Sequence, residues 1–539
     1  MVRLLAEETK FPDKALGKDI IGFPLLEQLP PVKYSCQDRL PKPRADAIQV
    51  SELRRHREVV NELVLAGVRE LLFSDDVLAI TREDAASGFM TEPVPLEDMD
   101  LTEVTLTRRI PVREHRAKGW RTRTVDHATE SLINGATFPC DRVHHDTIDV
   151  LICILLMFMT AGSEPRMWKR DVSKAFRRCP ISVEHLDLSW VVFAAEGRYW
   201  VSQHLGMPFG ATSAVYAWHR VGNLLAWVIL TSARAPLGRY VDDFFGASRS
   251  GIFWTGGKLL DVLGLALGFP MDPEKSVDSS VLMDVLGIEV DLQWARKLVS
   301  TCVSSDKAQK WAQALAEIVE TGICSPELGS KMAGRLSFAV TATCDRVGRA
   351  FVKPFYAQAN QPLLGWRCGT LLLNACLWWE QYLLRRMKSR HSVTLARPHW
   401  ICWTDAAGAS RLIAAVVCGP RGLFFVRAKV PDWLWGQFLP RRDNQIGVQE
   451  ALAVWLLVTS FKKLLGGALL TLYVDNDGVT AAYIKGSSDS PEVNSMVAIF
   501  WLFVSKEHLH PMFYRVESKA NIADGPTRPD DVGLSLIHI

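Results

Sequence analysis

The sequence contains few features that identify a chemistry at first sight. Its 11 cysteines are scattered over 539 residues, with no Cys-x-x-Cys pair and no histidine at zinc-ligand spacing, which argues against both a zinc site and a disulfide framework. The net charge is only +3, so nucleic-acid binding cannot be inferred from the total charge. The N-terminus carries charged residues before any apolar run, unlike a secretory signal. We therefore expect an intracellular protein, cytoplasmic or nuclear.

Long apolar runs are also missing. The most apolar segment, Val150 to Met159, is well short of the ~20 residues that span a bilayer, so we expect a buried helix there and no membrane association. Hydrophobic residues make up 48% of the sequence and charged residues 22%, which is typical of folded globular domains. A chain of this length exceeds one hydrophobic core, and we expect several domains.

The first half of the chain divides by pattern into two segments. Residues 1–100 form an N-terminal extension of unknown role, with Pro-rich turns, such as residues 41–43, and one helix at 51–72. Residues 101–300 alternate short strands with apolar helices, an α+β pattern. The clearest elements predicted there are strands at 190–193 and 199–201 and a helix at 214–230.

The second half predicts a helical segment and then a separate module. Residues 301–395 predict helices at 306–320, 326–343 and 371–387. Residues 396–530 predict an α/β order of three strands, helix, strand, helices and strand, at 400–404, 412–417, 423–427, 448–461, 469–474 and 512–516. Residues 531–539 are a doubtful tail, because Leu534 to Ile539 is what a common sequencing adaptor would encode if translated. We expect the natural reading frame to continue or differ beyond Gly533.

Two acidic segments between apolar residues indicate a metal site in residues 101–300. Asp242 and Asp243 follow Tyr240-Val241 and precede two phenylalanines, and Asp171 follows an apolar strand. An isolated Asp-Asp pair is most often a surface turn. Adjacent carboxylates near a core are costly unless a divalent cation neutralises them, however, and Mg²⁺ takes oxygen ligands. The three acids together therefore favour a metal site at two strand ends.

Further segments carry candidate contacts to phosphate or base. Gly206 to Gly210 is a tight turn before a helix, whose backbone amides could contact a ligand. A basic stretch is either a solvated face or a phosphate-binding surface, and contains Arg108, Arg109, Arg113, Arg116, Lys118, Arg121 and Arg123.

A second set of acids lies in residues 396–530. Asp405 and Asp475 each end a predicted strand, Glu450 lies in a predicted helix, and Asp524 lies in an Asn-Ile-Ala-Asp-Gly-Pro-Thr segment. Any one of them alone is more often a helix cap or surface acid than a ligand. Four acids at the ends of elements nevertheless suggest one pocket.

The order of these segments resembles motifs A, B and C of reverse transcriptases, over most of the chain. The resemblance implies an α+β right-hand polymerase with fingers and palm at 101–300 and thumb and connection at 301–395. It also implies that Asp171, Asp242 and Asp243 hold two Mg²⁺ about 3.5 to 4 Å apart, with Mn²⁺ as a substitute. Phe176 would be the steric gate that selects deoxynucleotides, although an ordinary core phenylalanine is the alternative.

The same resemblance assigns contacts to the incoming nucleotide. Arg121 and Arg123, followed by Asn134, resemble the fingers motif that grips the triphosphate, although many relatives place a lysine where Arg121 stands. Phe209 and Gly210 would lie at the substrate, and Lys275 matches the lysine of a later palm motif.

The second acid set resembles ribonuclease H, in which four carboxylates bind two metal ions that activate water. This implies an α/β ribonuclease H-like domain at 396–530, with Asp405, Glu450, Asp475 and Asp524 as ligands. Thr527 stands where relatives often have serine. The segment 431–446, with Trp433, Trp435, Arg441 and Arg442, is longer than a minimal link and would either contact the hybrid or pack the module.

Among reverse transcriptases, the motifs look most like those of DIRS-type or Ngaro-type retrotransposons. The partners implied are an RNA template, a DNA primer, an RNA–DNA hybrid and deoxynucleoside triphosphates, and such elements also encode a recombinase and a coat protein. The sequence shows no aspartic protease motif and no integrase or recombinase pattern. One alternative is a catalytically inactive, domesticated RNA-binding scaffold. A group II intron maturase or telomerase-like enzyme is a second, against which the C-terminal module argues.

Overall fold

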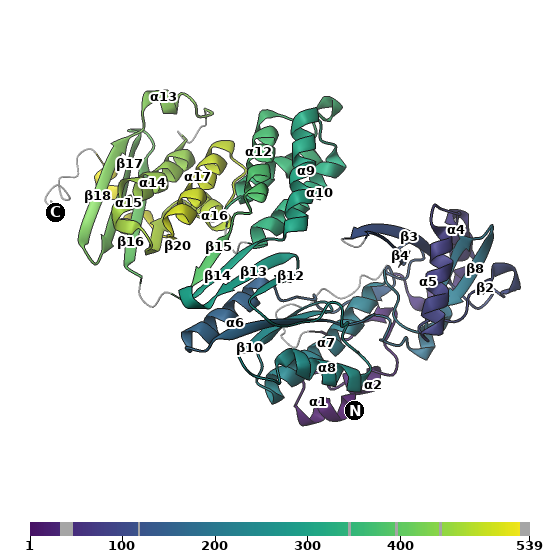
Figure 1. The fold of residues 1–539 in the computed structure, drawn as a ribbon. Coiled ribbons are helices and arrows are strands. Elements are labelled where there is room, and N and C mark those ends of the chain that lie inside the picture. The colour runs from purple at the N-terminus through teal and green to yellow at the C-terminus, as the bar shows by residue number, and fades with distance from the viewer. Residues whose placement is uncertain (33–46, 117–118, 343–345, 394–396, 441–444, 529–539) are drawn as a thin grey trace. The chain divides into compact units, whose positions relative to one another are not determined.

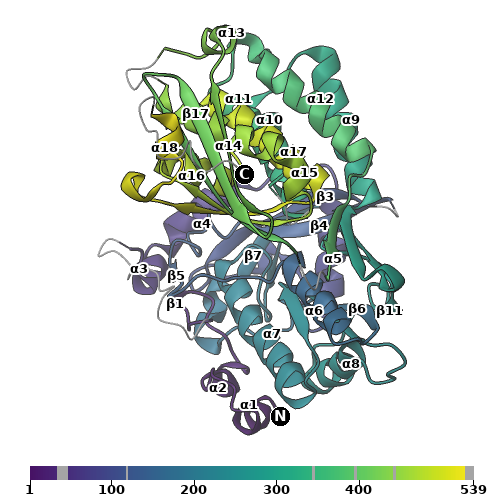
Figure 2. The same ribbon diagram turned by 90° about the vertical axis from the view of Figure 1, so that its left-hand side faces the viewer.

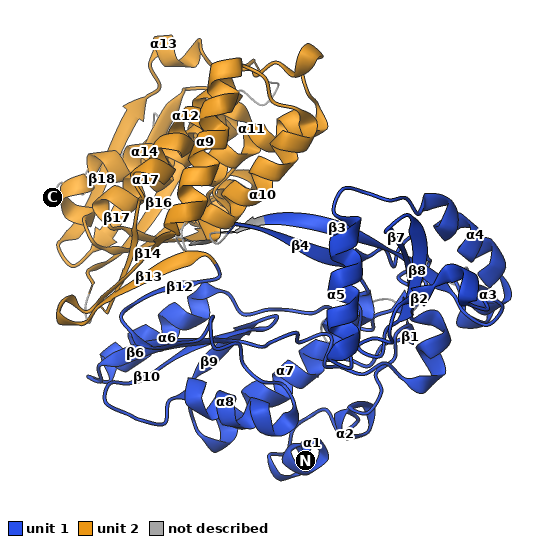
Figure 3. Ribbon diagram, turned by 45° about the vertical axis from the view of Figure 1, so that its right-hand side comes forward, with its two compact units in different colours: residues 1–286 blue, residues 287–539 orange. Residues whose placement is uncertain are grey.

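The computed structural model describes residues 1–32, 47–116, 119–342, 346–393, 397–440 and 445–528. The chain divides into two compact units, residues 1–286 and 287–539 (Figure 3). The Pro-rich turn at 41–43, Lys118, Arg441, Arg442 and the doubtful tail lie outside the described residues. The expected domain boundaries near 100, 300 and 395 stay predictions.

The first hundred residues of unit 1 are mainly helical and share its hydrophobic core. Val2, Phe11 and Leu16 belong to the same buried cluster as Trp218. The helix predicted at 51–72 is instead two helices that end at Gly67. The break between them lies at His56, where the backbone leaves the helical region with ψ at 18°. The helices are α1 (Val2–Glu8), α2 (Leu16–Asp19), α3 (Val50–Arg55), α4 (Arg57–Gly67) and α5 (Ser74–Ala86).

A five-stranded sheet in unit 1 has the order β2-β8-β7-β3-β4. Strands β3 and β4 form a long antiparallel hairpin, and β3 also pairs in parallel with β7. The predicted strands at 190–193 and 199–201 are confirmed as β7 and β8. The strands are β2 (Val94–Pro95), β3 (Leu106–Arg116), β4 (Gly119–Asp126), β7 (Trp190–Ala195) and β8 (Arg198–Gln203). A separate pair consists of β1 (Glu27–Gln28) and β5 (Thr137–Phe138).

A four-stranded sheet of order β11-β6-β10-β9 follows, and helices α6, α7 and α8 pack on it (Figure 1). Both predicted apolar helices are present, α6 with its apolar side buried and α7 buried over most of its length. The elements are α6 (Ile148–Thr160), β6 (Pro165–Asp171), α7 (Thr212–Ser232), β9 (Leu237–Tyr240), β10 (Asp243–Arg249), α8 (Gly256–Leu267) and β11 (Val277–Ser280), and β12 (Leu282–Val285) ends unit 1. No helix in the described part of the chain has the length and apolarity needed to cross a membrane.

Unit 2 begins with three antiparallel strands and four helices. The three predicted helices are present, but the sequence pattern missed α11, in which Pro354 lies inside the helix and obscures the helical signal. The elements are β13 (Ile288–Gln293), β14 (Leu298–Val303), α9 (Ser305–Thr321), α10 (Pro326–Ala342), α11 (Arg349–Asn360), α12 (Thr370–Leu384) and β15 (Ser389–Ser392).

The rest of unit 2 is a mixed five-stranded sheet of order β18-β17-β16-β19-β20. Helices α14 and α16 pack on this sheet, and α17 packs on these two helices (Figures 1 and 2). β16 pairs antiparallel with β17 and parallel with β19. The order predicted for 396–530 is confirmed. The elements are β16 (His399–Ala407), β17 (Leu412–Gly419), β18 (Gly422–Lys429), α13 (Asp432–Trp435), α14 (Ile446–Ser460), α15 (Lys462–Leu465), β19 (Leu469–Val474), α16 (Asp477–Lys485), α17 (Pro491–Glu507), β20 (His510–Arg515) and α18 (Asp524–Thr527).

Candidate active sites

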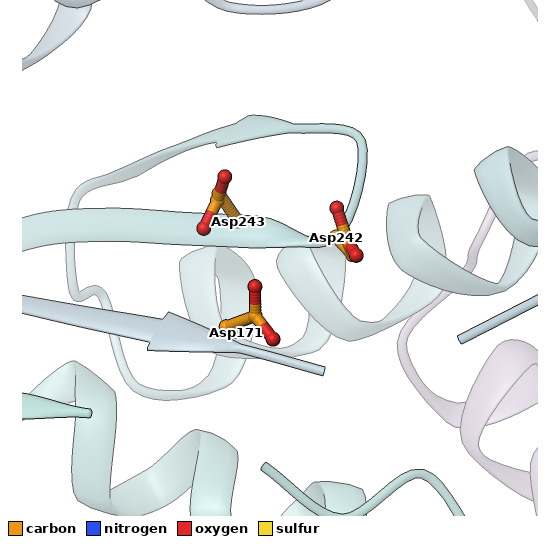
Figure 4. Close-up of side chains that lie close together, drawn as sticks. All are labelled: Asp171, Asp242 and Asp243. Atoms are coloured by element: carbon orange, nitrogen blue, oxygen red, sulfur yellow. The ribbon is translucent and has the colours of Figure 1, made fainter. Parts of the chain in front are cut away.

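Three aspartates of unit 1 meet where β6 ends and the β9–β10 hairpin turns. Asp243 is the antiparallel cross-strand partner of Asp171, and Asp242 occupies the turn before β10. Carboxylate oxygens of all three lie within 4.8 Å of one another (Figure 4). The structure thus brings together the three acids that the sequence singled out.

The crowding of these carboxylates disfavours their charged forms. Burial, together with the charges of Asp242 and Asp171, raises the pKa of Asp243 to about 7. Burial and the charge of Asp171 also raise the pKa of Asp242. A divalent cation would relieve this repulsion, and carboxylate oxygens are suitable ligands for a hard cation. The residues present therefore fit a metal site.

The turn that carries Asp242 is held in an unusual backbone conformation. Val241 has φ of 52°, which is rare for a β-branched residue. Its carbonyl accepts hydrogen bonds from Trp218 Nε1 at 2.8 Å and from the Arg239 guanidinium at 2.7 Å, and its N–H donates to His145 Nδ1 at 3.4 Å. These contacts keep a strained turn in place at the acid cluster.

Two basic residues support the cluster from different sides. Lys275 Nζ donates to Asp171 Oδ1 at 2.5 Å, so the predicted palm lysine does reach the site. Arg170 is buried and forms ion pairs with Asp261 of α8 at 2.7 Å and Asp278 of β11 at 2.9 Å. Arg170 therefore ties β6 to two neighbouring elements immediately before Asp171.

The predicted nucleotide contacts fall in two places. The rings of Phe176 and Phe209 stack with centroids 6.2 Å apart, and Phe209 is 43% exposed. Arg121 and Arg123 lie on β4, in a different sheet from the aspartates. Arg123 forms an ion pair with Glu114 at 3.1 Å, and Arg121 is exposed. The phosphate-binding role of these arginines stays a prediction.

Unit 2 contains a second group of three carboxylates. Asp405 lies on β16, Glu450 on α14 and Asp475 directly after β19, with carboxylate oxygens within 4.8 Å of one another. Ala406 N–H donates to Glu450 Oε1 at 3.2 Å. Glu450 Oε2 is buried and accepts no hydrogen bond from any described group. An unsatisfied buried oxygen beside two other carboxylates fits a bound cation.

Burial and mutual repulsion also raise the pKa values of two acids in this second group. Burial, with the charges of Asp475 and Asp405, raises the pKa of Glu450 to about 10. Burial also raises the pKa of Asp405, to which the charges of Asp475 and Asp524 add. Without a cation, burial and the neighbouring charges therefore favour the protonated form of Glu450.

Asp524, the fourth predicted acid, is not part of this three-carboxylate group. Its carboxylate pairs with Arg528, although it lies near enough to influence Asp405. Thr527 from the same short helix donates to Asp405 Oδ2 at 2.5 Å, and Asn521 Nδ2 donates to the carbonyl of Thr404 at 2.9 Å. The 521–528 segment thus orients Asp405 directly.

Sequence reasoning missed most of the groups that position these acids. Arg170 and Trp218 read as ordinary strand and helix residues, because their partners lie far away in the sequence. The sequence did single out Thr527, as the residue that stands where serine was expected, and Thr527 contacts Asp405. A serine or a threonine hydroxyl could donate this hydrogen bond.

No family model matches the sequence, and no curated protein matches it. Among solved structures, the foamy viral protease-reverse transcriptase dRH in complex with double-stranded DNA is similar, with 13% identity and a TM-score of 0.44 over 94% of this chain and 79% of that chain. The foamy viral enzyme with an RNA/DNA hybrid has 13% identity and a TM-score of 0.39, over 97% of this chain and 61% of that chain. The foamy viral enzyme with double-stranded DNA has 13% identity and a TM-score of 0.42, over 95% and 94%.

Proposed function

We propose that this chain is an RNA-directed DNA polymerase of a DIRS-like or Ngaro-like retrotransposon, with a ribonuclease H-like domain that cleaves the RNA of RNA–DNA hybrids. The observation that carries the proposal is the pair of three-carboxylate groups, one in each compact unit. The polymerase would have the right-hand form, with fingers and palm at 101–300 and thumb and connection at 301–395, followed by the ribonuclease H-like domain at 396–530.

In unit 1, Asp171, Asp242 and Asp243 would hold two Mg²⁺, for which Mn²⁺ is the expected substitute. Bound there, the ions would lower the pKa of the primer 3′-hydroxyl and neutralise charge on the departing pyrophosphate. Phe176 and Phe209 would contact the deoxynucleotide, and Arg121 and Arg123 its triphosphate. Arg123 already pairs with Glu114 through Nε, so this carboxylate would compete with the triphosphate for the guanidinium.

In unit 2, Asp405, Glu450 and Asp475 would hold the metal ions for RNA cleavage, which requires Glu450 to release its proton. Thr527 would keep Asp405 oriented through its hydroxyl. Asp524 would join as a fourth ligand after leaving Arg528. The two reactions belong together, because RNA must be removed before the new DNA strand serves as a template.

Primer extension tests the first activity. With Mg²⁺ and dTTP, purified protein should extend oligo(dT) on poly(rA), and the Asp243→Asn variant should not. Cleavage of labelled RNA in a hybrid, measured on the same preparations with EDTA as the metal-free control, tests the second. A folded wild-type protein that gives neither product overturns the proposal and favours the non-catalytic scaffold.

A further inference from the structure

The turn at residues 206–210, which carries Phe209, is held at both ends by segments distant in the sequence. At its start, Gly206 bridges to Pro180 and the N–H of Met207 donates to the Cys179 carbonyl at 2.8 Å. A Cβ added to Gly206 would lie only 1.9 Å from the Arg177 carbonyl oxygen. The turn therefore begins in close contact with the segment that follows Phe176.

At its end, the turn is held by strand β4 and the residues after it. Asp126 N–H donates to the Phe209 carbonyl at 3.1 Å. Gly210 has φ of 124°, and an added Cβ would lie 2.1 Å from the Asp126 carbonyl oxygen. Only glycine allows this approach.

Asn134 provides a second contact at this end through both groups of its side-chain amide. Its Nδ2 donates to the Gly210 carbonyl at 3.0 Å, and its Oδ1 accepts from the Thr212 N–H at 2.8 Å. A donor meets an acceptor at each position, so the orientation of the amide follows from its partners. Nδ2 also lies 3.2 Å from Thr129 Oγ1, a local contact that does not involve the turn.

The strand end that meets the turn is itself rigidly anchored. The Asp126 carboxylate is buried, pairs with Arg109 at 2.8 Å and contacts His204 at 3.0 Å. Burial alone would raise the pKa of Asp126, but the charge of Arg109 and the contact with His204 outweigh it and hold the pKa below its ordinary value. Arg177, the neighbour of Phe176, approaches the same carboxylate. The segments that carry Phe176 and Phe209 therefore both contact the buried residue Asp126.

We propose that Asn134 is a positioning residue that sets the Phe209 ring against Phe176, and so determines how closely the pocket fits the sugar of an incoming deoxynucleoside triphosphate. This inference rests on the proposed polymerase function. Asn134 acts only through the 206–210 turn and does not itself touch the nucleotide. Loss of its two hydrogen bonds should let the ring shift, which widens the sugar pocket without altering the three aspartates.

The test compares Asn134→Ala with Thr129→Ala in single-nucleotide primer extension with dTTP and UTP. Asn134→Ala should lower kcat/KM for dTTP about 10- to 100-fold, mainly through KM, and should reduce the preference for dTTP over UTP roughly 10-fold. Thr129→Ala removes only the local contact of the same amide and should behave as wild type. Unchanged KM and preference in a folded, active Asn134→Ala variant would overturn the inference alone, whereas an inactive wild type overturns the proposed function and this inference with it.

Hydrogen–deuterium exchange of the full chain gives a readout that does not depend on activity. Asn134→Ala should speed exchange of the Thr212 amide, whereas Asn134→Asp keeps the acceptor for that amide and should protect it while losing the donor to Gly210. Equal exchange in all variants would mean that Asn134 does not hold the turn, and the inference would be wrong.

Discussion

At the scale of single residues, the raised pKa of Asp243 predicts how the metal-free protein responds to pH. Because the folded-state pKa of about 7 exceeds the ordinary value near 4, unfolding releases a proton between these pH values. The free energy of unfolding should therefore fall as pH rises from 4 to 7, by a few kcal/mol at most from this group. Chemical unfolding in EDTA at pH 5 and pH 7.5 measures this fall.

The Asp243→Asn variant is the matched comparison for that titration. It should show a smaller loss of stability over the same interval, and adding Mn²⁺ at pH 7.5 should stabilise the wild type more than the variant. Identical pH dependence in the two proteins would show that Asp243 titrates normally.

A second residue-scale prediction concerns Thr527 and its hydrogen bond to Asp405. Thr527→Val keeps the shape but removes the donor, and should weaken Mn²⁺ binding in unit 2 about 10-fold or more, as is usual for groups that orient a ligand. Thr527→Ser keeps the hydroxyl and should bind as the wild type does. Calorimetric titration in an Asp243→Asn background, which weakens the site in unit 1, measures the difference. Equal affinities for valine and serine would contradict the role of the hydroxyl.

At the scale of elements, Arg170 joins β6, α8 and β11 through Asp261 and Asp278. Arg170→Met should lower the free energy of unfolding by about 2 kcal/mol, because it removes the buried guanidinium that joins two partly exposed carboxylates. Arg166→Met on the same strand removes one ion pair of a less buried arginine, to Glu164, and should cost less than about 1 kcal/mol. Urea unfolding measures the loss of stability in both variants. Similar losses would show that Arg170 stabilises the unit no more than Arg166 does.

At the scale of the whole molecule, the two carboxylate groups lie in separate compact units. A substitution in one group should therefore abolish one activity and leave the other intact. Asp243→Asn should reduce primer extension roughly 10³-fold or more and leave hybrid cleavage near the wild-type rate. Asp405→Asn should do the reverse. Parallel extension and cleavage assays on one preparation of each variant measure this, and loss of both activities in either variant would indicate one shared site.

Several parts of the fold follow from local sequence patterns. The α/β order of residues 396–530 could be predicted, because the spacing of apolar residues that distinguishes a strand from a helix is visible within a short stretch of sequence. The break at His56 and helix α11 could not, since a single backbone angle ends the first and Pro354 obscures the second. Where the local signal is weak or contradictory, packing decides the element.

The sequence by itself determined the chemical character of both sites, because all the candidate acids but Asp524 sit beside or within an apolar strand or helix, where a carboxylate needs a neutralising partner. Only the tertiary structure decided which acids meet. Asp171 and Asp243 become neighbours through the pairing of β6 with β10, while Asp524 pairs with Arg528. Strand pairing and hydrogen bonds such as those of Asn134 join residues far apart in the sequence, and no short window of sequence contains both partners.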